Sequence, residues 1–206
     1  MKISIIDIGL NNLNSVMSAC KKVGLKVNII SDYKSLINSD AILLPGVGAF
    51  NHAMKNLKKN NLDEGIKDYF NKGNPIFGIC LGMQILFSKS YENGIHNGLG
   101  IIKGEVKKFD KKFEIVPNIG WNKIKLINNN KGCLISNNEK FFYFVHSFYC
   151  SPNDKKIISS NSSFGNFKFC SSILQDNIEA FQFHPEKSGK NGLKIYNSIK
   201  LKLKRF

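Results

Sequence analysis

Residues 1–90 alternate between continuous apolar runs and amphipathic stretches. The apolar runs cover residues 2–8, 26–31, 40–46 and 75–79, and helical patterns cover residues 12–24, 50–72 and 81–90. Strands that are apolar along their whole length are typical of parallel sheets covered by helices on both faces, because neither face meets water. The alternation therefore predicts an α/β fold with a largely parallel sheet flanked by helices.

The rest of the chain is richer in strand patterns. Candidate strands cover residues 101–109, 121–127, 141–150, 155–160, 166–173 and 177–184, and an amphipathic helix over residues 192–204 closes the chain. We find no internal repeat, linker or domain boundary, and 206 residues are enough for one sizeable core. We predict a single α/β domain over residues 1–206 with a mixed sheet.

The charge and the apolar content narrow the classes of function. The formal net charge is +15, but Arg205 is the only arginine, and the lysines are spread along the whole chain among asparagines. Specific nucleic-acid binding favours clustered arginine, so we expect a solvated basic surface and no nucleic-acid partner. No run approaches the roughly 20 apolar residues that span a bilayer, and residues 1–13 do not resemble a signal peptide, so we expect a cytoplasmic protein without a membrane partner.

The cysteines do not form a framework. They are Cys20, Cys80, Cys133, Cys150 and Cys170. Their number is odd, their spacing is irregular and no CxxC occurs. We therefore expect neither a disulfide scaffold nor a zinc site. Four of them are interpreted as small buried apolar residues, and only Cys80 has a special sequence context.

Cys80 stands in "GICLG", between a predicted strand and a predicted helix. In open α/β sheets, ligands bind beyond the carboxyl ends of the strands, where this residue lies. Glycine two positions before and after a turning residue relieves crowding, so Gly78 and Gly82 match a nucleophile elbow with cysteine in place of serine. The dipole of the following helix is expected to favour the thiolate. The alternative is a buried cysteine beside two turn glycines.

A thiol nucleophile needs a base, and the base needs an orienting group. His52 and His96 are expected at the surface, and His146, in the run "FFYFVHSF", is placed near the site. His184 precedes Pro185, which favours an extended backbone, so His184 and Glu186 point to the same side. We interpret them as a base and its carboxylate. Alone, the tripeptide could equally be a solvated turn.

A glycine-containing turn follows the third predicted strand. Residues 43–50 read "LLPGVGAF", and the glycines of this turn, Gly46 and Gly48, allow the backbone to approach a ligand and expose N–H groups. An acyl-transfer enzyme needs such donors for an oxyanion. An ordinary strand-to-helix turn explains the same residues.

The three motifs together resemble class I (triad) glutamine amidotransferases. "PGVGAF", "GICLGMQ" and "QFHPEKSG" occur in the order and at the separations of that family, and the resemblance runs from residue 2 to about residue 200. The short length, "IDIGLNNLNSV", "PNIGWN" and "YFVHSF" are similar to the glutaminase subunits of imidazole glycerol phosphate synthases. The resemblance implies a flavodoxin-like fold and no cofactor or metal.

The resemblance also implies roles for the motif residues. Cys80 would attack the amide of L-glutamine, His184 would transfer the proton, and Glu186 would orient His184. Backbone N–H groups of Leu81 and of the Gly46–Val47 peptide would stabilise the oxyanion. The glutamine itself would be held by Gly46, Gly48, Gln84, His146 and Ser147.

The same resemblance implies a partner. In the family, a (β/α)₈-barrel cyclase forms a heterodimer with the glutaminase and receives ammonia through an internal channel for L-histidine biosynthesis. Trp121, Tyr143 and Lys187 match positions at that interface, and Asn118 falls in the segment that faces the partner. A lone tryptophan is more often a core residue, and a lysine after the HPE motif can simply be solvated.

Two positions depart from the family pattern. The family has "PHxGWN" where this chain has Asn118, and a glycine where it has Asn11; asparagine tolerates the left-handed geometry of such a turn.

Paralogous glutaminases supply ammonia to sugar-modifying amidotransferases of surface-glycan pathways, which leaves a second acceptor of the ammonia open. Two alternatives of other classes are a cysteine hydrolase acting alone and an inactive scaffold subunit. The complete set of Cys80, His184 and Glu186 disfavours the scaffold.

Overall fold

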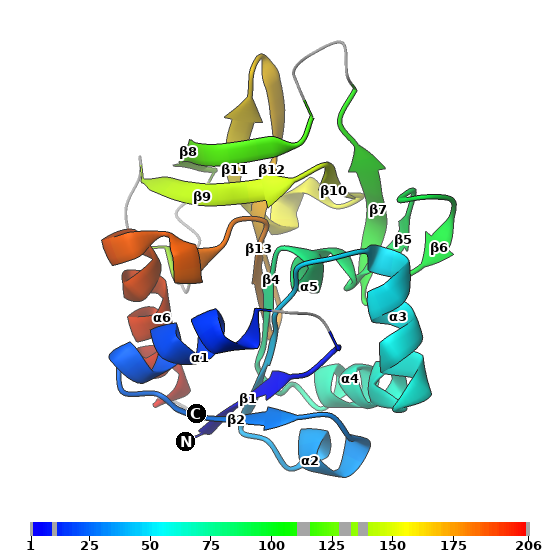
Figure 1. Ribbon diagram of the computed structural model, residues 1–206, viewed down its shortest axis with the longest axis vertical. Helices are drawn as coiled ribbons and strands as arrows, with labels where there is room; N and C mark the ends of the chain where they lie inside the picture. The colour runs from blue at the N-terminus through cyan, green and yellow to red at the C-terminus, as the bar shows by residue number, and fades with distance from the viewer. Residues whose placement is uncertain (1, 10–11, 111–115, 128–132, 136–139, 205–206) are drawn as a thin grey trace.

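We describe a computed structural model that covers residues 2–9, 12–110, 116–127, 133–135 and 140–204. Its centre is a nine-stranded mixed sheet with the strand order β2-β1-β3-β4-β13-β12-β11-β8-β9 (Figure 1). The parallel half contains β1 (Lys2–Ile6), β2 (Lys26–Ile30), β3 (Ala41–Leu44), β4 (Ile76–Ile79) and β13 (Ile178–Phe181). This half agrees with the predicted apolar strands.

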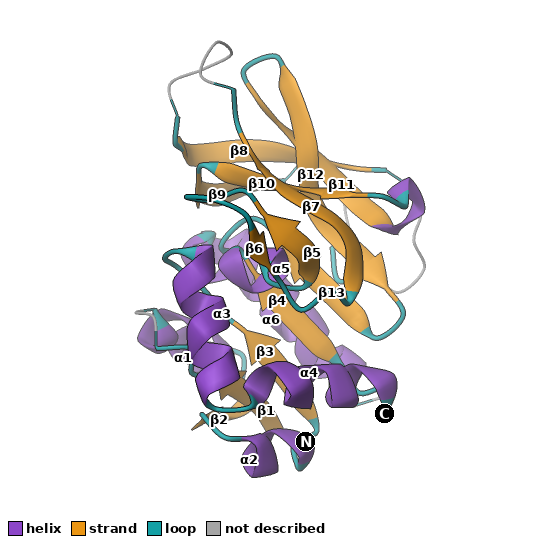
Figure 2. Ribbon diagram, turned by 90° about the vertical axis from the view of Figure 1, so that its right-hand side faces the viewer, coloured by secondary structure: helices purple, strands orange, loops and turns teal. Residues whose placement is uncertain are grey.

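The other half of the sheet is antiparallel. It contains β12 (Phe167–Gln175), β11 (Ile158–Phe164), β8 (Asn118–Leu126) and β9 (Phe141–His146). A separate four-stranded sheet has the order β10-β7-β5-β6, with β10 (Phe148–Pro152), β7 (Ile102–Lys108), β5 (Phe87–Ser90) and β6 (His96–Asn97). Figure 2 shows the helices gathered around the parallel half, while strands dominate the other end of the molecule.

Helices cover both faces of the parallel half. The described helices are α1 (Leu13–Lys22), α2 (Tyr33–Ile37), α3 (Phe50–Lys59), α4 (Leu62–Asn71), α5 (Leu81–Gln84) and α6 (Gly189–Leu203), with short 3₁₀ turns η1 (Lys155–Ile157) and η2 (Pro185–Lys187). Successive strand residues face opposite sides, so Ile42 and Leu44 of β3 join the core under α3 and α4, whereas Ala41 and Leu43 join the core under α1 and α6.

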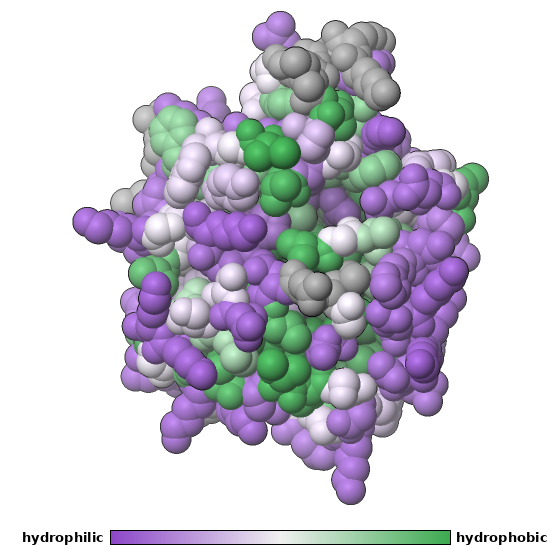
Figure 3. All heavy atoms as spheres, in the orientation of Figure 1, coloured by the Kyte–Doolittle hydropathy of each residue, from purple (hydrophilic) through white to green (hydrophobic). Residues whose placement is uncertain are grey.

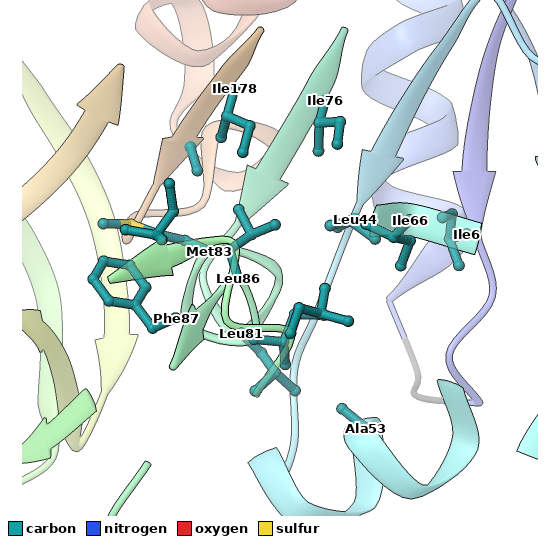
Figure 4. Close-up of a cluster of buried hydrophobic side chains, with 14 of the residues drawn as sticks. Ile6, Leu44, Ala53, Ile66, Ile76, Leu81, Met83, Leu86, Phe87 and Ile178 are labelled. Atoms are coloured by element: carbon teal, nitrogen blue, oxygen red, sulfur yellow. The ribbon is translucent and has the colours of Figure 1, made fainter. Parts of the chain in front are cut away.

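Figure 4 shows the first of these cores. Side chains at equivalent levels of successive strands, namely Ile42, Ile76 and Ile178, form one apolar row beneath the helices, and Ile76 and Ile178 are labelled in the figure. Leu81 and Phe87, which follow β4, pack into the same cluster, so the segment after Cys80 is anchored in the core. Burial of this kind contributes about 1.5–3 kcal/mol for each large apolar side chain.

Four predicted elements differ from the structure. The strand predicted over 155–160 begins as the 3₁₀ turn η1, and β11 continues to Phe164. The helix predicted over residues 50–72 is divided into α3 and α4 at Asn61, whose φ of 54° lies in the left-handed region that asparagine tolerates. The helix predicted over 81–90 ends at Gln84, because Phe87–Ser90 pairs with β7 as strand β5. The strand predicted over 141–150 is interrupted at Ser147, and its two parts enter different sheets.

The surface is predominantly hydrophilic, as the dispersed lysines and asparagines predict. Figure 3 shows this for one face, where apolar side chains gather mainly down the middle and a few others are scattered. None of the described helices is long and apolar enough to cross a membrane. Asn11, one of the two departures from the family pattern, lies outside the described residues.

Candidate active site

The turn at Cys80 is as tight as its glycines predict. Cys80 has φ 51° and ψ −106°, and its backbone N–H bonds to the Phe181 carbonyl at 2.6 Å. A Cβ atom on Gly82 would lie 1.9 Å from the carbonyl oxygen of Leu44 in β3, and one on Gly78 would lie 3.0 Å from the Ala180 Cβ. The chain can therefore make this elbow only with glycine at 82, which presses the turn against the neighbouring strand.

The helix after the elbow is shorter than predicted. α5 is one turn, in which the N–H groups of Met83 and Gln84 bond to the Cys80 carbonyl at 3.0 and 3.1 Å. A helix macrodipole sums over aligned peptide units. A single turn therefore stabilises negative charge on the sulfur less than the predicted ten-residue helix would. Other groups around Cys80 must supply the remaining stabilisation of a thiolate.

His184 and Glu186 follow β13, which pairs in parallel with β4, so their strand ends at the same edge as Cys80. The His184 Nδ1 and Glu186 Oε1 atoms are 2.7 Å apart, and both side chains are fully buried. The Glu186 Oε1 atom also accepts a hydrogen bond from Asn12 Nδ2 at 2.7 Å. The carboxylate is thus fixed from two sides, and it holds the imidazole as the sequence predicted.

The electrostatics favour a charged His184. Burial opposes the charge, but the Cys80 sulfur and the Glu186 carboxylate outweigh it and raise the pKa of His184 to about 10. Within the described part of the chain the Nε2 atom has no hydrogen-bond partner, although it faces the sulfur closely enough for this effect. Catalytic hydrogen bonds in unliganded enzymes are often long, and the arrangement suits a thiolate–imidazolium pair.

A cavity of about 510 Å³ opens at Cys80. Its lining includes the expected residues Val47, Gly48, Leu81, Gln84, His146 and Ser147. Gly46 packs beneath it, since a Cβ atom there would lie 2.7 Å from the Leu81 Cβ. The turn after β3, the elbow and the β9–β10 junction therefore meet at one site, as the motifs predicted separately.

Glu92 also lines this cavity and was missed by the sequence analysis. It is the only acidic residue among the described residues of the lining, and its Oε2 atom accepts a hydrogen bond from the Phe50 N–H at the start of α3, at 2.7 Å. It stands in the turn after β5, just beyond a segment that the sequence predicted as a helix. No motif links it to the cavity, so only the tertiary structure could identify it.

His146 forms part of the wall and not a second base. Burial lowers the pKa of His146 to about 4, so its imidazole is neutral. The Nδ1–H donates to the Phe148 carbonyl at 2.8 Å, and Nε2 accepts from the side-chain amide of Asn118 at 2.9 Å. The ring packs between Phe109 and Phe169. These contacts fix the turn at Ser147 from which β9 and β10 diverge.

The four residues expected at the partner interface separate into two groups. Trp121 is 53% exposed, its ring lies 6.2 Å from that of Tyr143, and the Lys187 ammonium lies 5.8 Å from the Tyr143 ring centre. These three form one surface. Asn118 is only 2% exposed, because β8 alternates and turns Ile119 and Trp121 outward. The expectation that the Asn118 side chain faces a partner is corrected: it is an interior residue.

Comparison with known proteins agrees with the motifs. The family model for "Glutamine amidotransferase class-I" matches residues 4–200. The imidazole glycerol phosphate synthase subunit HisH of Aquifex aeolicus is 44% identical over 206 residues, with 100% of this chain and 99% of that protein covered. The subunit HisH of Prochlorococcus marinus is 45% identical over 198 residues, with 94% and 93% covered.

Solved structures support the fold. The structure of PurLQS from Thermotoga maritima aligns with a TM-score of 0.77 at 18% identity, covering 98% of each chain. A glutamine amidotransferase from Thermotoga maritima aligns with a TM-score of 0.66 at 14% identity, covering 100% of this chain and 84% of that one. With the family model and the relatives above, the conclusion is plain: this chain belongs to the class I glutamine amidotransferase family.

Proposed function

We propose that this chain is the glutaminase subunit of an imidazole glycerol phosphate synthase, acting as one domain over residues 1–206. It hydrolyses L-glutamine to L-glutamate and ammonia. The observation that carries the proposal is the buried His184–Glu186 pair, 2.7 Å apart, beside an elbow cysteine that opens into a cavity. The full-length relatives at 44% and 45% identity favour imidazole glycerol phosphate synthesis, and not a glycan pathway, as the reaction that uses the ammonia.

The geometry gives each residue a step. The Cys80 sulfur attacks the side-chain amide carbon of glutamine, and the C–N bond breaks as His184 passes its proton to the leaving ammonia. Water then attacks the thioester, with neutral His184 accepting its proton, and the sulfur leaves as glutamate forms. Backbone N–H groups of Leu81 and Val47, which line the cavity, stabilise the oxyanion.

Glutamine has an α-ammonium group that needs an anion. Glu92 is the one carboxylate among the described residues of the cavity lining, and we assign it to this group. Gly48 and Ser147 line the same cavity and bring backbone groups to the substrate. A single carboxylate in the lining distinguishes an amino-acid amide from simple amides, because it attracts the α-ammonium group that simple amides lack.

The partner in this proposal is a (β/α)₈-barrel cyclase in a heterodimer. The outward face of β8 and β9 supports it: Ile119 is 59%, Trp121 53% and Phe141 50% exposed, and Tyr143 lies among them. Exposed apolar side chains gathered on one sheet face are typical of interaction sites. The site and this face share η2, since Lys187 follows Glu186 directly.

The test addresses separately the role of Cys80 as nucleophile and the pathway that uses the ammonia. In the complex with the cyclase, Cys80→Ala is expected to abolish glutamine-dependent synthesis and to leave synthesis from ammonium salt unchanged. Glutamine hydrolysis retained by Cys80→Ala would remove the assignment. If a glycan-pathway amidotransferase activates the chain and the cyclase does not, the pathway is wrong and the glutaminase stands.

A further inference from the structure

Gln182 is a buried side chain in contact with the nucleophile. It lies two residues before His184 and is 0% exposed. Its Nε2 atom lies 3.5 Å from the Cys80 sulfur, and its Oε1 atom accepts a hydrogen bond from Gln84 Nε2 at 3.2 Å. The steps proposed above give Gln182 no role.

The orientation of both amides follows from one carbonyl group. The Phe148 carbonyl can only accept, and Gln84 Nε2 lies 3.0 Å from it, so this atom must be the amide nitrogen. The second N–H of Gln84 then faces Gln182 Oε1. Gln182 therefore presents its NH₂ group to the sulfur, since the reverse orientation would place two NH₂ groups face to face.

The same carbonyl is held from its other side. His146 Nδ1 donates to it at 2.8 Å, and Asn118 Nδ2 donates to His146 Nε2 at 2.9 Å. Asn122 Nδ2 in turn donates to Asn118 Oδ1 at 2.8 Å. Hydrogen bonds are stronger in such buried surroundings than in water, so the position of the Phe148 carbonyl is well defined.

We propose that Gln182 is a fixed hydrogen-bond donor to the Cys80 sulfur, and that Gln84 is the positioning residue that keeps Gln182 in this orientation. A thiolate accepts a hydrogen bond better than a thiol does, so the donor favours the reactive form. This hydrogen bond adds to the stabilisation that the charged His184 gives a thiolate, because α5 is too short to stabilise the thiolate much. The proposal rests on Cys80 as the reacting thiol of the proposed function.

The test measures the reactivity of the thiol and not turnover. The full chain is treated with iodoacetamide at one fixed pH, and alkylation of the Cys80 peptide is followed by mass spectrometry. Gln182→Met, which keeps the size but has no N–H, is expected to slow alkylation about fivefold, the equivalent of one ordinary hydrogen bond. Gln175→Met, at the end of β12, is the matched control and should react at the wild-type rate.

A double-mutant cycle tests the positioning role. Gln84→Met is expected to slow alkylation in the wild-type chain but not in Gln182→Met, because it acts only through Gln182. Wild-type reactivity of Gln182→Met would overturn the proposal, and additive effects would overturn the role of Gln84. Should Gln182→Met not fold, Gln182→Leu, which likewise has no N–H, should slow alkylation by the same factor. Failure of the proposed function is distinguishable, since only the Cys80→Ala turnover assay reports it.

Discussion

Gly82→Ala tests the packing that forms the elbow. The added Cβ would lie 1.9 Å from the Leu44 carbonyl oxygen, and contacts of real Cβ atoms essentially never fall under 3.0 Å, so β3 and the turn must separate by about 1.1 Å. Overpacking a core costs about 1–3 kcal/mol when side chains can adjust. Here the obstacle is the backbone of a central strand, so we expect a loss of about 3 kcal/mol or more.

The assay is urea unfolding of Gly82→Ala beside two matched glycine variants. With a slope of about 2 kcal/mol per molar urea, the midpoint should fall by about 1.5 M. A Cβ atom in Gly78→Ala would lie 3.0 Å from the Ala180 Cβ and from the Gly82 carbonyl oxygen, a smaller overlap, so this variant should lose less stability. Gly65→Ala meets side chains, the Tyr33 ring at 2.9 Å and Leu36 Cδ1 at 3.5 Å, and gains helix propensity of up to about 1 kcal/mol. Near-wild-type stability and glutaminase activity of Gly82→Ala would refute the reasoning.

Two further predictions concern charge and the partner. The pKa of His146 is lowered from 6.5 to about 4 in the folded chain, so the unfolded chain takes up this proton first and stability should fall by about 3 kcal/mol as the pH drops from 6.5 to 4. Acid unfolding of His146→Asn should lack this slope; an equal slope would show that other groups cause it. Trp121→Ala should weaken cyclase binding about 30-fold, as a hot spot of about 2 kcal/mol does, and leave the urea midpoint unchanged. Ile95→Ala, at a side chain that is 70% exposed in the turn before β6, is the control, and equal affinities measured by calorimetry would exclude Trp121 from the interface.

The sequence predicted the parallel half of the sheet because its signals are local. Most residues of these strands are apolar, and most of the strands are followed by a helical pattern, which is what burial on both faces requires; the edge strand β2 is buried only at Ile30. The elbow at Cys80 and the pair His184–Glu186 were equally readable, since steric crowding at a turn and the side on which residues i and i+2 lie depend on a few neighbouring residues. These features place the nucleophile and the base at one sheet edge.

The interruptions of predicted elements could not be predicted from the sequence. Residues 87–90 satisfy a helical pattern, but they form β5 because pairing with β7 and burial of Phe87 against the core outweigh their local preference. The break at Ser147 arises in the same way. His146 donates a hydrogen bond to the Phe148 carbonyl, and the strands on either side, β9 and β10, pair in different sheets. Both outcomes depend on partners distant in the chain.

The sequence by itself determined which residues can carry the chemistry, because the motifs specify a nucleophile, a base and a carboxylate together with the backbone turns that they need. Only the tertiary structure decided their surroundings. It turned Asn118 inward to His146, brought Glu92 into the cavity and placed the amide of Gln182 against the sulfur. Hydrogen bonds between distant residues leave no periodic signal in a sequence, because they depend on where folding brings two side chains and not on what lies beside either of them.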